Sequence, residues 1–249
     1  MPELMEFMNR NAVPVRNMTP EDAVWAAELM RLRRLEYACY SPVFWRPAAD
    51  ATGLHSAFLE RQILSDANIA LRADHGFIIG QRHDAEVFVD DYAVDSQGSW
   101  DRDGAALLFA ACEQFAARDK LRSVRVVTAH ADQPKSTMLS DLSLHVAEQW
   151  WVRELRPSGP PGRAGRVEEP DFAGILGMAP PVYDPGGHVF LADSVAGSAK
   201  PARIEERAAE LGAVLAVVPA EPGSDRGADL RERGWHIASD WYVGWPLDC

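Results

Sequence analysis

The sequence predicts an α/β protein of the layered α+β kind, in which a mixed, mostly antiparallel sheet is flanked by helices. Three observations lead to this prediction. Residues 13–155 show strand-like and helix-like patterns in the order β-α-α-β-β-β-α-β-α-β, a proline- and glycine-rich stretch follows, and the remainder repeats part of what precedes it. At 249 residues the chain is long enough for two cores. We therefore expect a whole domain at 1–156, a linker at 157–165 and a partial second copy at 166–249.

The first elements are a short strand and two helices. The strand is expected at 13–16. Thr19 then caps a helix, Asp22 stands at its third position, and apolar residues recur at helical spacing to about Tyr37. An aromatic loop that contains Phe44 and Trp45 separates this helix from a second one at 53–64. These two aromatic residues either rim a binding cleft or belong to the core.

Three closely spaced strands follow, and a polar loop then leads into a third helix. After this helix the pattern predicts a strand, a short helix and a long final strand. The expected ranges are 69–73, 76–79 and 86–94 for the three strands, 95–103 for the loop, 104–118 for the helix, and 123–128, 134–142 and 144–155 for the last three elements.

The C-terminal part repeats elements of the N-terminal part. Leu139–Val152 aligns without gaps with Leu230–Val243, and Val87–Asp91 matches Val189–Asp193. The second copy has no counterpart of the first strand and two helices, and its loop at 195–201 lacks the glycine spacing of the first. We expect this copy to pack against the first one and to wall a cleft, with tryptophans in the seam.

The charge balance argues against a nucleic-acid partner. The formal net charge is −12, from 37 acidic and 25 basic residues, whereas nucleic-acid binders usually carry a basic surface. The small cluster of Arg31, Arg33 and Arg34 falls on the first helix and is interpreted as a solvated face.

Cysteine usage and hydropathy indicate a cytoplasmic protein without a metal site. Cys39, Cys112 and Cys249 show no CxxC spacing, and no histidine pair has metal-ligand spacing. Cys112 is expected to be a buried apolar residue. No signal peptide and no run of about 18 apolar residues is visible, so no membrane association is expected.

One stretch resembles the GNAT superfamily of N-acetyltransferases. Tyr92-Ala93-Val94 ends a strand, a loop of nine residues follows, and Gly104-Ala-Ala-Leu-Leu108 opens a helix. In that family the backbone amides at this helix start hold the diphosphate of acetyl-CoA, the co-substrate, as helix N-termini hold anions generally. The resemblance implies a coenzyme site formed by Tyr92, Ala93, Val94, Ser99, Trp100, Asp101, Arg102, Asp103, Gly104, Ala105, and Ser136 or Thr137.

The loop departs from the family pattern Gln/Arg-x-x-Gly-x-Gly/Ala. Without gaps, Ser99 stands at the Gln/Arg position and Arg102 replaces the first glycine. A shifted reading starts at Asp101 and places an acid beside phosphates. We prefer the gapless register, in which Arg102 offers a charge as well as its amide.

The reaction that the resemblance implies is direct attack of an amine on the thioester, assisted by a general base. Strand alternation places Glu86, Phe88, Asp90 and Tyr92 on one face. Asp90 is the first candidate for the base, directly or through a water molecule, and Glu86 is the second. The alternative is that Asp90 is merely solvated near a strand end.

The usual acid of the family is a tyrosine, but Leu139 stands at its position. His130 is a possible substitute, although a lone loop histidine is more often without function. Two hypotheses follow. The first is an acyl-CoA-dependent N-acyltransferase that acts on a small-molecule or peptide amine. The alternative is a catalytically weak or silent relative that binds acyl-CoA or a small ligand, or serves as an interaction module. The acceptor and the oligomeric state are open.

Overall fold

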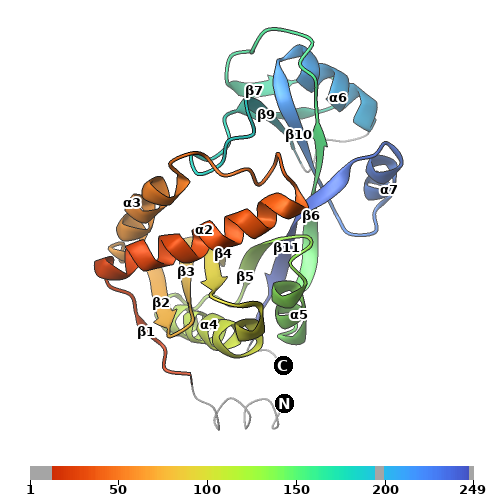
Figure 1. Cartoon of the computed structure of the whole chain (residues 1–249). Helices are drawn as coiled ribbons and strands as arrows, with labels where there is room; N and C mark the ends of the chain where they lie inside the picture. Colours follow the sequence, from red (N-terminus) through yellow and green to blue (C-terminus); the bar gives the residue numbers. More distant parts are fainter. Residues whose placement is uncertain (1–12, 194–198, 247–249) are drawn as a thin grey trace.

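The computed structural model describes residues 13–193 and 199–246, and within these ranges eleven strands form one continuous sheet (Figure 1). Their spatial order is β1-β2-β3-β4-β5-β11-β6-β10-β9-β8-β7. The strands are β1 (Arg16–Asn17), β2 (Asn68–Ala73), β3 (Gly76–His83), β4 (Glu86–Val94), β5 (Val124–Ala129), β6 (His145–Glu154), β7 (Gly165–Glu168), β8 (Ala173–Gly177), β9 (His188–Ala192), β10 (Ala213–Ala220) and β11 (His236–Gly244). This confirms the mixed, mostly antiparallel sheet flanked by helices.

The helices lie where the apolar periodicity places them, with ends shifted by a few residues. A 3₁₀ turn η1 (Pro20–Asp22) precedes the first long helix, and the Thr19 amide donates to the Asp22 carboxylate at 2.9 Å as the capping pattern predicts. The other helices are α2 (Ala23–Tyr40), α3 (Ala51–Ile63), α4 (Ala105–Asp119), α5 (Gln133–Asp141), α6 (Pro201–Glu210) and α7 (Asp225–Glu232).

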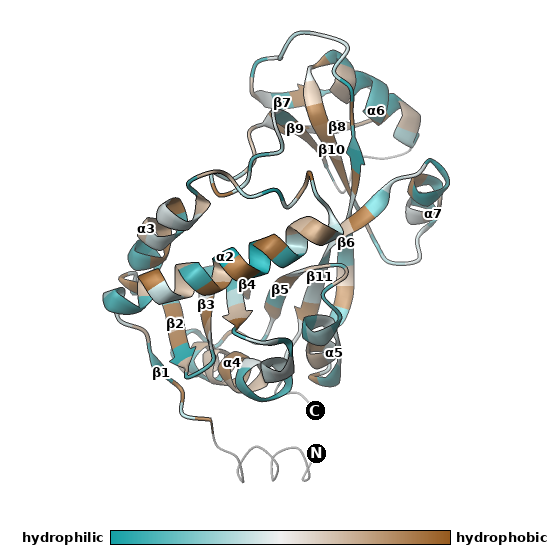
Figure 2. Ribbon diagram, in the orientation of Figure 1, coloured by the Kyte–Doolittle hydropathy of each residue, from teal (hydrophilic) through white to brown (hydrophobic). Residues whose placement is uncertain are grey.

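Two cores form on opposite faces of the N-terminal part of the sheet. Helices α2 and α3 cover one face, where Phe77, Ile79 and Ala93 are buried against them. Helices α4 and α5 cover the other face, where Ile78 and Val89 are buried. Figure 2 shows the corresponding amphipathic pattern around α2, whereas β10 is hydrophobic along its length.

A β-bulge in β4 changes which side chains share a face. Gly80 of β3 pairs with Val89 and Ile78 pairs with Tyr92, so Asp90 and Asp91 together oppose one residue. Simple alternation, which placed Tyr92 beside Asp90, is therefore wrong beyond Asp90. Tyr92 joins Val89 in the core under α4.

The internal repeat is visible in the fold. The unit β4-α4-β5-α5-β6 recurs as β9-α6-β10-α7-β11, and β9 pairs in parallel with β10 as β4 does with β5. The alignment of Leu139–Val152 with Leu230–Val243, in which residue numbers differ by 91, relates β6 to β11. The proposed match of Val87 to Val189 is one residue out of register, because Val87 is buried under α4 whereas its counterpart under α6 is Phe190.

The two halves exchange their last strands. β11 lies between β5 and β6, and β6 lies between β11 and β10, so each final strand completes the sheet of the other half. Gln149 pairs with Asp240, its own counterpart in the repeat, which places a pseudo-twofold axis between them. On one face of this axis Trp150 stacks on its counterpart Trp241 at 4.7 Å between ring centroids.

The linker packs along the C-terminal end of α6 and is hydrogen-bonded to it. The Ser158 amide donates to Ala209 O and the Gly162 amide to Leu211 O, at 2.9 and 2.8 Å. The division at 157–165 stays a prediction, and the exchanged strands show that the sheet crosses it. Val195–Ser198 of the second loop and Cys249 lie outside the described residues.

Candidate functional site: a cavity between the halves

A cavity of about 360 Å³ lies between the two halves, on the face of the sheet that carries Trp150 and Trp241. Its volume is in the range of sites for small ligands. Both halves contribute walls, as the sequence predicted for the second copy. The lining residues are Phe44, Trp45, Phe88, Asp90, Val127, Trp150, Ile175, Gly177, Met178, Ala179, Pro180, Tyr183, Pro185, Val189, Leu191, Leu215, Val217, Ser239 and Trp241.

Two irregular segments form the roof of this cavity. The aromatic loop after α2 pairs with the segment after β8 through a bridge between Pro47 and Tyr183 and a bond from the Ala48 amide to Val182 O at 3.0 Å. Trp45 is anchored by its indole nitrogen, which donates to Ala238 O at 3.0 Å. Phe44 and Trp45 both line the cavity, and Trp45 is also buried in a small core cluster against which Phe44 packs, so these residues rim the cavity and belong to the core at once.

Asp90 is the single charged side chain among the described lining residues. The side chain of Asp90 is exposed where it lines the cavity, and protein surrounds it on its other sides. Burial, and then the neighbouring Asp91 charge, raise the pKa of Asp90 to about 6. A carboxylate held this way is able to take a proton near neutral pH or to bind a cation.

Asp91, on the other arm of the bulge, belongs to a buried chain of polar groups. His55 Nε2 lies 2.7 Å from Asp91 Oδ1, and Arg34 Nη2 contacts His55 Nδ1. Arg34 is 1% exposed and Arg33 is 4% exposed. The interpretation of the arginine cluster as a solvated face is therefore wrong for both residues, because their partners lie beneath α2, and it is right only for Arg31, which is exposed to solvent and pairs with Glu28 at 2.6 Å.

Beside the cavity, β4 and β5 separate and Lys135 of α5 lies between them. The strands pair only as far as Val89 and Val126. Lys135, which is 1% exposed, donates from Nζ to Val127 O at 2.9 Å and approaches Tyr92 O at 3.5 Å. Its ammonium thus joins one carbonyl on each separated strand.

Further buried groups fill the same gap. Arg33 pairs with Asp132, and Tyr37 donates to this carboxylate at 2.9 Å. The ring of Trp100 lies 5.3 Å from Lys135 Nζ and 5.5 Å from the Arg33 guanidinium. The space that remains is about 10 Å³, which is room for about one water molecule. Burial lowers the pKa of Lys135 to about 8.

The loop expected at 95–103 is wound into helical turns. A 3₁₀ turn η2 (Gln97–Ser99) and a π-helical turn η3 (Trp100–Gly104) extend α4 backward. Trp100, Asp103, Gly104 and Ala105 are buried, whereas Asp101 and Arg102 are exposed and Ser99 is half-buried. Arg102 is paired with Asp103 at 2.8 Å.

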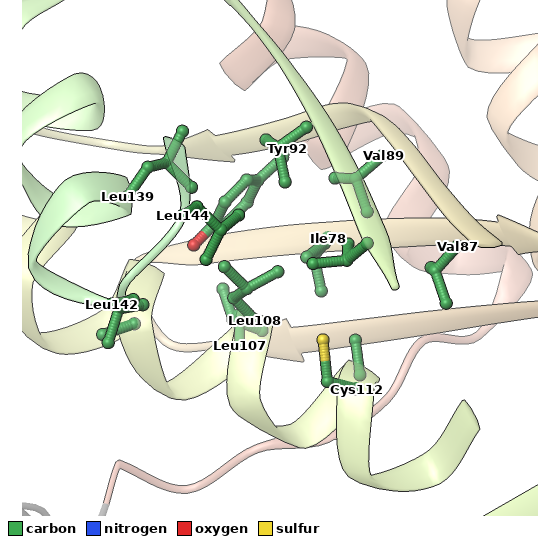
Figure 3. Packing of buried hydrophobic residues seen from close by; sticks show 14 of the residues in the cluster. Ile78, Val87, Val89, Tyr92, Leu107, Leu108, Cys112, Leu139, Leu142 and Leu144 are labelled. Carbon is green, nitrogen blue, oxygen red and sulfur yellow. The ribbon is translucent and has the colours of Figure 1, made fainter. Parts of the chain in front are cut away.

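Other residues expected at a coenzyme site are also in the interior. Ala93 and Val94 are buried in the core, and the Tyr92 hydroxyl donates to Gly104 O. Leu139 packs in the same core as Tyr92 (Figure 3), so no side chain at this position offers an acid. Several buried atoms near the gap have no hydrogen-bond partner among the described residues: Trp100 Nε1, Ser136 Oγ, Arg33 Nε and Asp132 Oδ1.

The two remaining catalytic candidates lie away from the cavity. Glu86 is paired with Arg125 at 2.7 Å at the other end of β4. His130 Nδ1 lies 2.7 Å from Asp240, and this hydrogen bond raises the pKa of His130. Neither residue lines the cavity.

Cys112 is fully buried, as expected, and its pKa is raised by burial. No helix in residues 13–193 and 199–246 is both long and apolar enough to cross a membrane. Within the same ranges, no group of three or more His, Cys, Asp or Glu side chains is arranged to hold a metal ion.

Solved structures that are similar to this chain over most of its length include acetyltransferases of the GCN5-related (GNAT) kind. A protein from Thermoplasma acidophilum that bears the name of an acetyltransferase superposes with a TM-score of 0.58 at 11% identity, over 93% of this chain and 98% of its own. A GCN5-related N-acetyltransferase from Sphaerobacter thermophilus gives 0.56 at 11% identity, over 94% and 95%. One from Kribbella flavida gives 0.52 at 9%, over 93% and 70%.

The chain therefore has the GNAT fold, in a tandem form whose second copy is partial. The sequence matches no protein-family model, and a search of the curated proteins finds no relative. At these identities the likeness establishes the fold and leaves the chemistry to the site.

The GNAT fold implies a coenzyme, and in this conformation the residues present leave no room for its arm. A coenzyme with its diphosphate at η3 and its acyl group at Asp90 must pass its arm between β4 and β5. Lys135 and Trp100 occupy that passage, and Lys135 takes backbone carbonyls on both strands. Sequence reasoning missed Lys135, although a lysine near the start of the short helix expected at 134–142 was a visible signal.

Proposed function

We propose that this protein binds a small cationic amine with an apolar or aromatic body in the cavity between its halves. The single observation that supports this is the composition of the wall. Six aromatic side chains, from Phe44, Trp45, Phe88, Trp150, Tyr183 and Trp241, surround a space in which Asp90 is the one charged residue among those of the described ranges that line it. Aromatic faces attract cations, and a carboxylate completes the recognition of an ammonium group.

The test is a calorimetric titration with phenethylamine and with phenethyl alcohol, which has the same aromatic body without the charge. We expect the amine to bind at least about 10-fold more tightly, because a charge-assisted hydrogen bond contributes about 1.5–3 kcal/mol. Equal affinity for the two probes, or no binding of either, would contradict the proposal.

Two variants locate the contact. Asp90→Asn keeps the shape of the side chain and removes its charge, so we expect a loss of about 10-fold or more in affinity for the amine. Asp84→Asn removes one charge from the surface of a turn, where Asp84 is 94% exposed, and serves as the control. Because the pKa of Asp90 is raised to about 6, affinity should fall as the pH drops below 6.

A second candidate is acyl transfer from an acyl-CoA to the bound amine. The unpartnered buried atoms near the gap, Trp100 Nε1 and Ser136 Oγ among them, favour it, because polar groups of this kind are found where a ligand supplies the missing partner. The raised pKa of Asp90 also suits a general base. This function requires Lys135 and Trp100 to leave the gap. Thiol release from acetyl-CoA with phenethylamine present tests it, and Asp90→Asn should then reduce turnover.

A further inference from the structure

We infer that Lys135 closes the gap between β4 and β5 from within, and that the N-terminal half therefore holds no coenzyme. The inference is independent of which ligand fills the cavity. It rests on the four contacts of the Lys135 ammonium, with two backbone carbonyls and two aromatic rings, and on the size of the remaining space.

The ammonium takes the backbone partners that a coenzyme arm needs. Where two parallel strands separate, their inner carbonyl and amide groups lose their ladder partners, and an extended ligand with amides can replace them. Lys135 donates to Val127 O at 2.9 Å and lies 3.5 Å from Tyr92 O. One side chain thus links both strands.

The surroundings hold the lysine in place. Its Nζ lies 5.0 Å from the centre of the Tyr92 ring and 5.3 Å from that of Trp100. The charged groups that face it are Asp132, Arg33, Asp90 and Asp91. Three carboxylates against one arginine compensate the charge of the buried ammonium, and moving the ammonium away removes the donor that Val127 O accepts from, which is costly.

The remaining space excludes the arm. About 10 Å³ is free in the gap, whereas about 360 Å³ is free in the cavity next to it. Asp90, Trp45, Val127 and Tyr183 line both spaces. The gap therefore adjoins the cavity but is filled by side chains, and Lys135 is one of the residues that line what remains of it.

Amine labelling provides a direct test, because the chain has only three lysines, Lys120, Lys135 and Lys200. Lys120 and Lys200 are exposed, so an acetylating N-hydroxysuccinimide ester should modify them in the native protein and leave Lys135 unmodified by peptide mass spectrometry. Saturating acetyl-CoA should not change this pattern. If acetyl-CoA makes Lys135 reactive at the rate of Lys120, the coenzyme displaces the lysine and the inference is overturned.

Removing the side chain should open the gap. We expect folded Lys135→Ala to gain binding of pantetheine, which carries the arm without the diphosphate, and the wild type and Lys120→Ala to show none by calorimetry. Binding to the wild type, or none to a Lys135→Ala protein with native circular dichroism, would contradict the inference. Should Lys135→Ala not fold, the labelling experiment decides alone. Phenethylamine affinity is measured in parallel and reports on the cavity separately.

Discussion

Asp90 combines a functional position with an energetic cost. Its carboxylate lines an apolar cavity beside Asp91, and both burial and the like charge disfavour its ionised form. Residues of this kind are kept for what they bind or catalyse rather than for stability. The same side chain should therefore affect ligand binding and stability in opposite directions.

We predict that Asp90→Asn raises the melting temperature at pH 7 to 8. The pKa of Asp90 is about 6 in the folded chain, above its ordinary value of 3.8. Between these two values the folded state binds more protons than the unfolded state, so the contribution of Asp90 to stability falls as the pH rises. Thermal unfolding of both proteins from pH 4 to pH 8 checks this. The gain of the variant should shrink below pH 4, and a variant that is less stable at pH 8 would contradict the prediction.

At the scale of single residues, sequence reasoning succeeded only in part. It singled out Asp90 because GNAT enzymes commonly carry their base on the strand before the loop, and strand alternation places Asp90 on one face of that strand. It misjudged Arg33 and Arg34, because a helix pattern does not reveal a carboxylate or histidine far along the chain, such as Asp132 or His55, that pairs with the buried charge.

Among the secondary-structure elements, the turn before α4 shows that a local sequence pattern does not by itself determine the conformation of a loop. The strand, the loop length and Gly104 match a phosphate-binding turn, yet the loop winds into η2 and η3. Trp100 begins η3, and its buried ring packs against Tyr92, with 5.0 Å between the two ring centroids.

We expect Gly104→Ala to destabilise the protein by about 1–3 kcal/mol through overpacking. A Cβ at Gly104 would lie 2.8 Å from Trp100 Cε3 and 3.2 Å from the Tyr92 hydroxyl. Gly98→Ala in the preceding turn is the matched control, since a Cβ there meets nothing within 4 Å. Urea unfolding at constant m-value measures both variants. Equal stability of the two would show that the turn is looser than described.

Helix and strand positions up to β6 were otherwise well predicted, because periodicity and capping act over short distances, whereas β7 and β8 were not predicted. The bulge at Asp90 and Asp91 was not, since it depends on the pairing of β4 with β3. The exchange of β6 and β11 between the two halves could not be predicted from the sequence either. Both strands have the same pattern whichever half they complete, and only packing in space decides between the partners.

For the whole molecule, the exchanged strands make the two halves interdependent. Tyr242 and Trp245, from the C-terminal part, are buried in the core under α4, and Trp151 from the N-terminal part is buried in the core with α6. Neither half retains a whole sheet or a whole core by itself. The cavity, which lies across the junction, depends on both halves being present.

We predict that a protease site placed in the linker at 157–165 can be cut after folding without separating the halves. Size-exclusion chromatography of the cut protein should show one species of unchanged size. Residues 1–156 expressed alone should be aggregation-prone, because β5 and β6 then lack the strand that joins them. Two separate soluble species after cleavage would contradict the exchange.

The exchange also bears on synthesis of the chain. His130 meets Asp240 across 110 positions of sequence, so β5 lacks its neighbour until the final strand has left the ribosome. After α4 and α5 have been synthesised, the edge of β5 that pairs with β11 stays unpaired until the whole second copy has been translated. Such long-range closure slows folding and exposes the edge to wrong partners. Holding chaperones should therefore matter more to this protein than to one whose domains close in order.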